Sequence, residues 1–253
     1  MPYPAHVSDA AYCYDGSYAG FLCCIFESYT RREIPSAVLG PAEGQITLFG
    51  TEAIATDPTH ARRVANGLTR LGPMVRERVM TGFLSTEEEK DLILLRFARR
   101  CFDEGPRAVQ MLGDPDVHAA FVLERNVNNE VCRFIEFIRF EEKDGMLGSV
   151  IHPKNNVLPL LCGHFCSRLP DEDFLIFDAA HGTALLRQSG HVQYLAMEHY
   201  EPARDADELN WQALWKRFFH ALTIEERRNA KAQMNHAPKR FWGGMVEMRE
   251  PYI

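Results

Sequence analysis

Apolar and polar residues at the start of the chain predict a strand, a tight turn and a helix. A short strand over residues 11–14 is followed by Asp15 and Gly16, which favour a turn. Ser17 is well suited to cap the helix that comes next. Apolar side chains between positions 21 and 26 then recur at helical spacing, so we expect their face to be buried.

Further helices are predicted in the next part of the chain. One follows Pro58, and another begins at a cap on Ser85 or Thr86 with three glutamates in its first turn, where the helix dipole favours acids. A third is predicted to run from Asp116 towards Glu130.

The middle of the chain changes to a strand pattern. Residues from Phe134 to Phe140 alternate in polarity and lead to turn residues at Asp144 and Gly145, which predicts a β-hairpin. A helix is predicted over residues 157–169, and two or three strands over residues 173–197. Helices return over residues 211–222 and from Glu225 onward.

This order of elements favours the α+β class. Helices and strands come in separate runs, so we expect a mainly antiparallel sheet with flanking helices rather than a doubly wound parallel sheet. Long linkers and internal repeats are absent from the sequence, which predicts a single integrated domain over residues 1–253. Within it, a helical lobe is expected at about residues 57–130.

Composition narrows the class of protein. No apolar run approaches the roughly 18 residues that span a bilayer, and the N-terminus lacks the pattern of a signal peptide, so we expect a cytoplasmic protein without membrane contact. Seven irregularly spaced cysteines fit buried free thiols in a reducing compartment. The net charge of -7 disfavours a protein that coats nucleic acid indiscriminately, but it allows a local basic face.

The segment from Arg227 to Trp242 is such a basic face. It holds five lysines or arginines and no acid, and Pro238 is predicted to break its helix. Cations neutralise phosphates and an aromatic ring can stack on an unpaired base. The alternative is a solvated helix face balanced by neighbouring glutamates, with Trp242 in the core. The predicted nucleic-acid-binding residues are Arg227, Arg228, Lys231, Lys239, Arg240 and Trp242.

The sequence CGHFC places His164 between Cys162 and Cys166. On a helix the two cysteines share a face while His164 points about 200° away, so the three are poorly placed to bind one metal ion. No CxxC pair occurs, and an iron–sulfur cluster needs more thiolates, so we predict neither a metal nor a cofactor. Two core cysteines beside a functional or capping histidine is the favoured interpretation.

A second group of residues could carry acid–base chemistry. Asp178 ends an apolar strand, and His181 begins a turn with Gly182, so an aspartate could orient a histidine for proton transfer. The candidate catalytic residues are therefore His164, Asp178 and His181, with His152 nearby in the sequence. An ordinary turn explains the same residues, and no known nucleophile or nucleotide-binding motif accompanies them.

The turn at the start of the chain is a third candidate. Backbone N–H groups of Gly16 and Ser17, between a strand and a helix N-terminus, could cradle a phosphate. A simple turn followed by a helix cap accounts for these residues equally well.

Three of these segments carry a family resemblance. YDGSYAGFLCCIFESY, the stretch from Arg133 to Asp178, and the segment from Arg227 to Trp242 together resemble the bacterial family labelled "probable DNA metabolism protein". Members are typically encoded beside a radical S-adenosylmethionine protein suspected of DNA modification or repair. A similar domain is fused to a uracil-DNA glycosylase domain in other bacteria. The resemblance implies a DNA-repair setting and a radical enzyme as partner.

The resemblance carries over to particular positions and fails at others. The family pattern favours Met-Pro-Lys-Arg-Tyr-Trp, where this chain has Ala237 before Pro238 and Phe241 before Trp242. An arginine usual after the Asp178 strand is replaced by His181 or absent. The matching residues are Asp15, Gly16, Ser17, Leu158, Pro159, Leu160, His164, Phe165, Asp178, Pro238, Lys239, Arg240 and Trp242.

Three hypotheses follow from the sequence. The first is a nucleic-acid-binding accessory protein that works with a radical S-adenosylmethionine enzyme in DNA repair or modification. The second is an enzyme that acts directly on a nucleobase or nucleotide through histidine and aspartate. The third is a protein-interaction module whose basic segment docks on an acidic partner.

Overall fold

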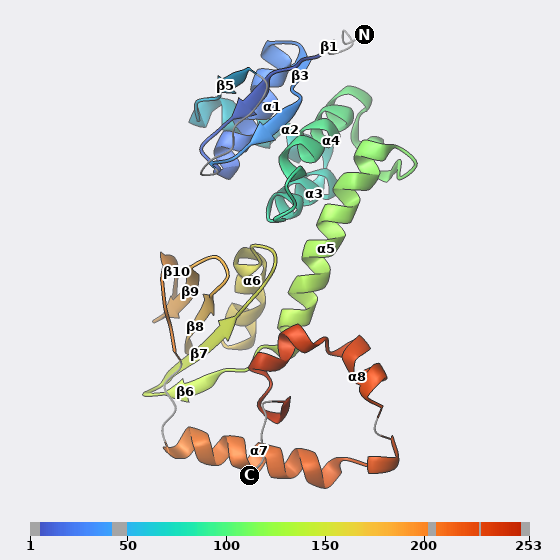
Figure 1. The fold of residues 1–253 in the computed structure, drawn as a ribbon. Helices are drawn as coiled ribbons and strands as arrows, with labels where there is room; N and C mark the ends of the chain where they lie inside the picture. The colour runs from blue at the N-terminus through green and yellow to red at the C-terminus, as the bar shows by residue number, and fades with distance from the viewer. Residues whose placement is uncertain (1–5, 42–49, 202–205, 228, 249–253) are drawn as a thin grey trace. The chain divides into compact units, whose positions relative to one another are not determined.

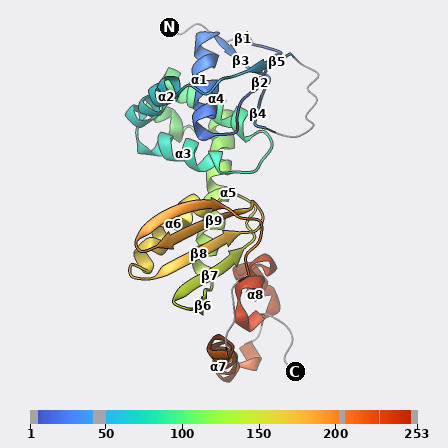
Figure 2. The same cartoon turned by 90° about the vertical axis from the view of Figure 1, so that its left-hand side faces the viewer.

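The chain folds into two compact units. A computed structural model describes residues 6–41, 50–201, 206–227 and 229–248, and Figures 1 and 2 show the fold in two views. Unit 1 is Met1–Asn128 and unit 2 is Asn129–Ile253, with helix α5 (Pro115–Phe137) running across the boundary. The predicted single integrated domain is therefore not supported, because the chain forms two separate compact regions.

Unit 1 combines short parallel strands with a helical core. Strand β2 (Ala11–Cys13) lies between β4 (Ala37–Leu39) and β5 (Thr51–Ala53), and β1 (His6–Val7) pairs with β3 (Glu33–Ile34), all in parallel. Its helices are α1 (Tyr18–Thr30), α2 (Pro58–Leu71), α3 (Pro73–Phe83), α4 (Lys90–Glu104), the 3-10 helix η1 (Pro106–Gln110) and the first part of α5.

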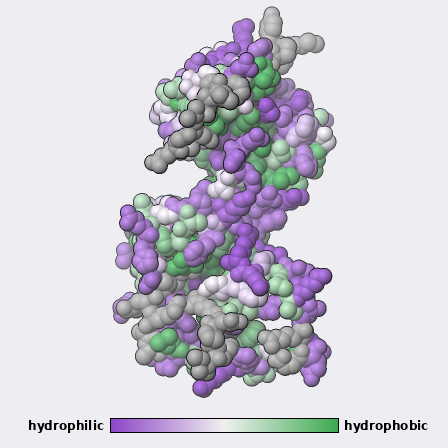
Figure 3. Space-filling model, viewed as in Figure 1, coloured by the Kyte–Doolittle hydropathy of each residue, from purple (hydrophilic) through white to green (hydrophobic). Residues whose placement is uncertain are grey.

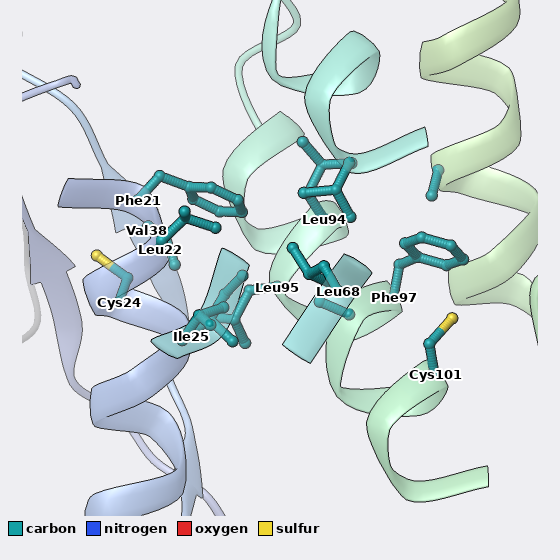
Figure 4. Close-up of a cluster of buried hydrophobic side chains, with 14 of the residues drawn as sticks. Phe21, Leu22, Cys24, Ile25, Val38, Leu68, Leu94, Leu95, Phe97 and Cys101 are labelled. Carbon is teal, nitrogen blue, oxygen red and sulfur yellow. The ribbon is translucent and has the colours of Figure 1, made fainter. Parts of the chain in front are cut away.

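The helices of unit 1 meet in one hydrophobic core. Phe21 and Ile25 from α1 and Leu68 from α2 are fully buried against Leu95 and Phe97 from α4 (Figure 4). The predicted buried face of α1 is thus confirmed. The helix predicted to follow Pro58 is confirmed as well, with Asp57 accepting hydrogen bonds from the first backbone N–H groups of α2.

The start of α4 differs from the prediction. Ser85 Oγ accepts a hydrogen bond from the backbone of Glu87, but this closes a turn, and the helix begins only at Lys90. From α2 to α5, helices follow one another without an intervening strand.

Unit 2 is built on one mixed sheet. Its strand order is β10 (His191–Ala196), β9 (Thr183–Gln188), β8 (Asp173–Asp178), β7 (Met146–Ile151) and β6 (Glu141–Lys143). Among these strands only β7 and β8 are parallel neighbours, and helix α6 (Leu158–Arg168) connects them and packs against the sheet (Figures 1 and 2). The remaining elements are α7 (Ala206–Leu222), η2 (Glu225–Arg227), α8 (Ala230–His236), η3 (Lys239–Gly244) and η4 (Val246–Met248).

The α+β class is confirmed, but the prediction of a mainly antiparallel sheet is wrong. The strands of unit 1 pair in parallel, and the sheet of unit 2 is mixed. Parallel neighbours need a long crossover, which α1 supplies between β2 and β4 and α6 supplies between β7 and β8. The separate runs of helices and strands in the sequence concealed these two crossovers.

The predicted hairpin in the middle of the chain is half right. Its turn is confirmed, because Asp144 and Gly145 both have the positive φ angles of a two-residue hairpin turn, 53° and 76°. Its first strand is wrong, since α5 continues to Phe137 and β6 begins only at Glu141. Val127, Val131 and Phe134 are buried at helical spacing, and this longer period outweighs the local alternation.

No helix in the described ranges combines the length and the apolar character that crossing a membrane requires.

Candidate nucleic-acid interface

The basic segment Arg227 to Trp242, which we call the tail, is not one continuous helix. Arg227 ends η2, and Asn229 caps α8 by accepting a hydrogen bond from the Ala232 backbone. Arg227 and Lys231 therefore lie on separate helices. Arg228 itself lies outside the described residues. The predicted break at Pro238 is confirmed, since α8 ends at His236 and a 3-10 helix follows.

The end of the tail is anchored to α5. Phe241 is only 5% exposed and its ring packs on Phe134, with 5.0 Å between the ring centres, and on Phe137 at 5.8 Å. Arg133 Nη1 donates a hydrogen bond of 2.8 Å to the backbone oxygen of His236. The tail is thus part of the core of unit 2 at Phe241.

Arg240 has a structural partner. Its Nη1 lies 3.1 Å from Oε1 of Glu130, a carboxylate on α5 that is only 2% exposed. Glu130 also accepts hydrogen bonds from the backbone N–H of Lys154 and from the backbone and side chain of Asn155. Buried charges are tolerated when they are paired in this way. The Arg240 side chain is nevertheless 52% exposed, so one guanidinium edge is accessible to a second anion.

The other described cations of the tail face solvent. Arg227, Lys231 and Lys239 are exposed, and Trp242 is half-buried. The indole Nε1 of Trp242 donates a hydrogen bond of 2.8 Å to the backbone oxygen of Ala237, and Lys239 Nζ lies 5.8 Å from the centre of the indole. Trp242 is therefore only partly buried, and the hydrogen bond to Ala237 holds its indole against the tail.

A cavity of about 240 Å³ lies between the tail and strands β6 and β7, and we call it the tail pocket. Its lining comes from the end of α5, from β6 and β7, and from η3. Five polar side chains contribute to the lining. The exposed ones are Arg139, His152 and Arg240, and the buried ones are Glu141 and Ser149.

A second hollow adjoins the first and contains His164, so we call it the His164 pocket. Its volume is about 630 Å³, and its lining includes His164 and Arg168 from α6 and Trp215 from α7. The two pockets share Ile138 and Arg139, which lie in the link between α5 and β6. Arg139 therefore faces both hollows, and three arginines, Arg139, Arg168 and Arg240, line this region of unit 2.

Sequence reasoning missed Arg139, Arg168, Ser149 and Trp215. Each is an isolated residue without a motif, and only the folding of α5, α6, α7 and β7 brings them to the two pockets. Trp215 and the arginines could have been found only by asking which aromatic and cationic residues accompany the predicted His164 helix.

The predicted catalytic residues fall into two places. His181 Nδ1 lies 2.7 Å from Oδ2 of Asp178, which is within hydrogen-bond distance, and Asp178 is 1% exposed. Oδ1 of Asp178 accepts hydrogen bonds from the backbone N–H groups of Ala180 and His181, so this carboxylate also closes the turn after β8. His164 instead lines its own pocket, and no contact within the described chain joins it to Asp178. His152 lines the tail pocket.

The predicted phosphate site in unit 1 is occupied by its own side chains. Ser17 Oγ accepts a hydrogen bond from the backbone N–H of Gly20, which caps α1, and donates one to Oδ1 of Asp15. Hydrogen bonds from Ser17 and then from Thr56 hold the pKa of Asp15 below its usual range. The backbone N–H of Ser17 already donates a hydrogen bond to Oδ1 of Asp15, and this carboxylate disfavours a phosphate there, so the geometry fits the turn-and-cap interpretation.

The cysteines near His164 form a thiol pair. Cys162 Sγ and Cys166 Sγ are 3.9 Å apart on one face of α6, as the helical spacing predicts. Burial, together with the hydrogen bond to Cys162, raises the pKa of the Cys166 thiol. Within the ranges that the structure describes, no three His, Cys, Asp or Glu side chains gather as metal ligands would.

Comparison with known proteins places this region in a family. The model of a family described as "Domain of unknown function (DUF4130)" matches residues 88–247, which is more than half of the chain. The chain belongs to the DUF4130 family. No curated protein and no solved structure matches it. The DUF4130 match includes the tail, both pockets and the Asp178–His181 pair, whereas Gly16 and Ser17 lie outside it.

Proposed function

We propose that unit 2 binds nucleic acid, and that this DUF4130 protein is an accessory factor of DNA repair or modification that works with a radical S-adenosylmethionine enzyme. One observation carries the nucleic-acid part: the exposed cations Arg227, Lys231 and Lys239 belong to the same unit as two adjoining pockets that share Arg139. The DNA setting and the enzyme partner rest on the resemblance of three sequence motifs.

The chemistry of these residues suits a nucleic-acid strand. Arginine and lysine neutralise phosphates and release bound counterions, and this effect supplies most of the affinity of a strand. Trp215 is exposed at the His164 pocket, where an aromatic ring accompanied by arginines offers a base a surface for stacking. Because the whole chain carries a charge of -7, binding should be confined to this local surface.

Salt dependence tests the proposal. Binding of a labelled single-stranded or double-stranded DNA, measured by fluorescence anisotropy, should weaken steeply as salt rises. Changing Arg227, Lys231 and Lys239 to alanine should weaken binding. The same change should flatten the salt slope by about 0.7 for each phosphate of a single strand that is no longer neutralised.

A matched control is available in unit 1. Arg62 and Arg70 are exposed cations of α2, so the double alanine variant removes positive charge from unit 1 and leaves the cations of unit 2 in place. This variant should keep the affinity and the slope of the wild type. The proposal would be contradicted if the affinity did not change with salt. It would also be contradicted if the α2 variant weakened binding as much as the tail variant does.

Helix α7 supports the partner in this proposal. Several of its large apolar side chains are exposed, and Figure 3 shows apolar surface among hydrophilic residues where α7 lies in Figure 1. Exposed apolar groups of this kind mark protein contacts. A pull-down with the neighbouring radical enzyme, followed by DNA-binding assays of the free and the paired protein, tests it. DNA binding that occurs only in the complex would instead support a pure interaction module. The exposed residues are Leu209, Trp211, Leu214, Trp215, Phe218 and Leu222.

One observation favours a second candidate, an enzyme that acts on a nucleobase. His181 and Asp178 are within hydrogen-bond distance, which is the arrangement of an oriented general base. Asp178 already serves the turn, and neither residue lines the tail pocket or the His164 pocket. If this candidate holds, His181→Ala should abolish turnover of a modified or damaged nucleoside while DNA binding stays intact.

A further inference from the structure

The wall of the tail pocket combines apolar and polar side chains. Phe134, Ile138 and Phe241 are buried side chains of its wall, and Phe137 and Val150 are half-buried. A volume of about 240 Å³ is below the roughly 300–1,000 Å³ typical of sites for drug-sized ligands. The pocket therefore suits a small planar group with apolar faces.

Ser149 contributes a hydroxyl group to this wall. The residue as a whole is 4% exposed and lines the pocket. Its hydroxyl is not an unmet buried group, since Ser8 Oγ is the one fully buried side-chain atom without a hydrogen-bond partner among the described residues. A serine hydroxyl both donates and accepts, so a ligand with a hydrogen-bonding edge can pair with Ser149.

The charged side chains of the lining differ in exposure. Glu141 is buried, whereas Arg139 and Arg240 are exposed. Exposed arginines can neutralise a phosphate at the surface of the protein. A neutral ring that carries a phosphate would therefore place the phosphate on these arginines.

Part of strand β7 lines the pocket without pairing to β6. Strand β6 pairs with β7 only over Met146–Gly148, while Ser149, Val150 and Ile151 continue along the pocket beyond that pairing. On its other side β7 is paired along its whole length with β8. The pocket thus lies where β7 has a neighbouring strand on one side only among the described residues, and the free side of such a strand can offer backbone hydrogen-bonding groups.

We propose that the tail pocket holds one unpaired nucleobase, with the phosphates of its strand on Arg139, Arg240 and Lys239. This inference rests on the proposed nucleic-acid binding of unit 2. The aromatic wall stacks on or encloses the base, Ser149 bonds to its edge, and the exposed cations neutralise the backbone outside.

Two DNA ligands of equal charge distinguish base recognition by the tail pocket from phosphate binding by the exposed cations. One is a short mixed-sequence single-stranded DNA, and the other is a strand of the same length made only of abasic deoxyribose phosphates. The wild type should bind the strand with bases about tenfold or more tightly, because the abasic strand has no rings to stack and no base edges to bond. This ratio of dissociation constants measures base recognition alone.

Two substitutions of one residue assign that ratio to the pocket. Ser149→Ala removes the hydroxyl and should reduce the ratio about threefold or more, and Ser149→Val also fills the cavity and should bring the ratio close to one. Ser167→Ala, an exposed serine on α6 whose hydroxyl bonds within its own helix, is the matched control and should leave the ratio unchanged. Circular dichroism of each variant checks the fold.

The possible failures are distinguishable. Equal binding of both strands by the wild type, or an unchanged ratio in both Ser149 variants, would overturn the pocket while the proposed function stands. Lack of binding to either strand would overturn the proposed function and the pocket together. Lys239→Ala should weaken binding of both strands by the same factor, since it removes only a cation that meets phosphate.

Discussion

The guanidinium of Arg240 forms an ion pair with Glu130 across 3.1 Å, although 110 positions separate the two residues in the chain (240 minus 130). The pair joins the 3-10 helix of the tail to the buried side of α5, next to the rings of Phe241 and Phe134. A residue predicted to bind phosphate is therefore also part of a structural ion pair.

Arg240→Ala should destabilise unit 2. The change leaves the buried Glu130 carboxylate with its three amide hydrogen bonds but without its counter-charge, at an expected cost of about 1–3 kcal/mol. Urea unfolding followed by circular dichroism measures this loss. Arg240→Lys keeps the charge and should lose less, and Lys231→Ala, an exposed cation of α8, should leave the stability within about 0.5 kcal/mol of the wild type.

Phe241→Ala should be more damaging than any charge change in the tail. The ring is buried against Phe134 and Phe137, so its removal leaves a cavity, and such truncations cost about 3–5 kcal/mol. Phe241→Leu should cost less because it refills part of the space. A thermal melt that shows no difference between the two variants and the wild type would contradict the packing described for η3.

Asp178→Ala should lower the stability of the fold. It removes the acceptor of two backbone N–H groups in the turn after β8 and the partner of His181, at an expected cost of about 2–3 kcal/mol. His181→Ala should cost under about 1 kcal/mol, because it leaves the backbone bonds of the turn intact. Urea unfolding of both variants measures the difference, and an equal loss in the two would argue against the capping role.

Tyr18 should make the chain sensitive to alkali. Burial raises the pKa of Tyr18 to about 12, whereas an unfolded tyrosine loses its proton near 10. The unfolded state therefore releases the proton first, so the stabilisation is complete below about pH 10 and is lost as pH rises towards 12. Tyr18→Phe should show a smaller loss of stability over this window in urea unfolding. Burial also raises the pKa of Tyr12, Tyr14 and Tyr29, so a residual loss remains.

Local chemistry was the part of the fold that the sequence predicted well. Gly16 adopts a positive φ of 79° and Ser17 caps α1, and Asp144 with Gly145 forms the hairpin turn, all as their residue types indicated. Such features depend on a few adjacent residues, so a single sequence contains enough information to place them.

Pairing between distant segments could not be predicted in the same way. The parallel pairing of β7 with β8 depends on where α6 lies, and the extension of α5 through Phe134 depends on burial against Phe241. For the same reason the sequence indicated the cations of the tail but not Arg139 or Ser149. These two residues become candidates only because the fold places them in the lining of the tail pocket. The tie between Arg240 and Glu130 likewise had no local signal.

The three tryptophans, Trp211, Trp215 and Trp242, all belong to unit 2, and the last two lie at the His164 pocket and beside Lys239. Excitation at the red edge of protein absorbance therefore selects emission from this half of the chain, with no contribution from unit 1. A ligand that approaches either indole would quench or shift that emission. The protein thus contains its own optical reporter, and titrations can follow binding without an attached dye.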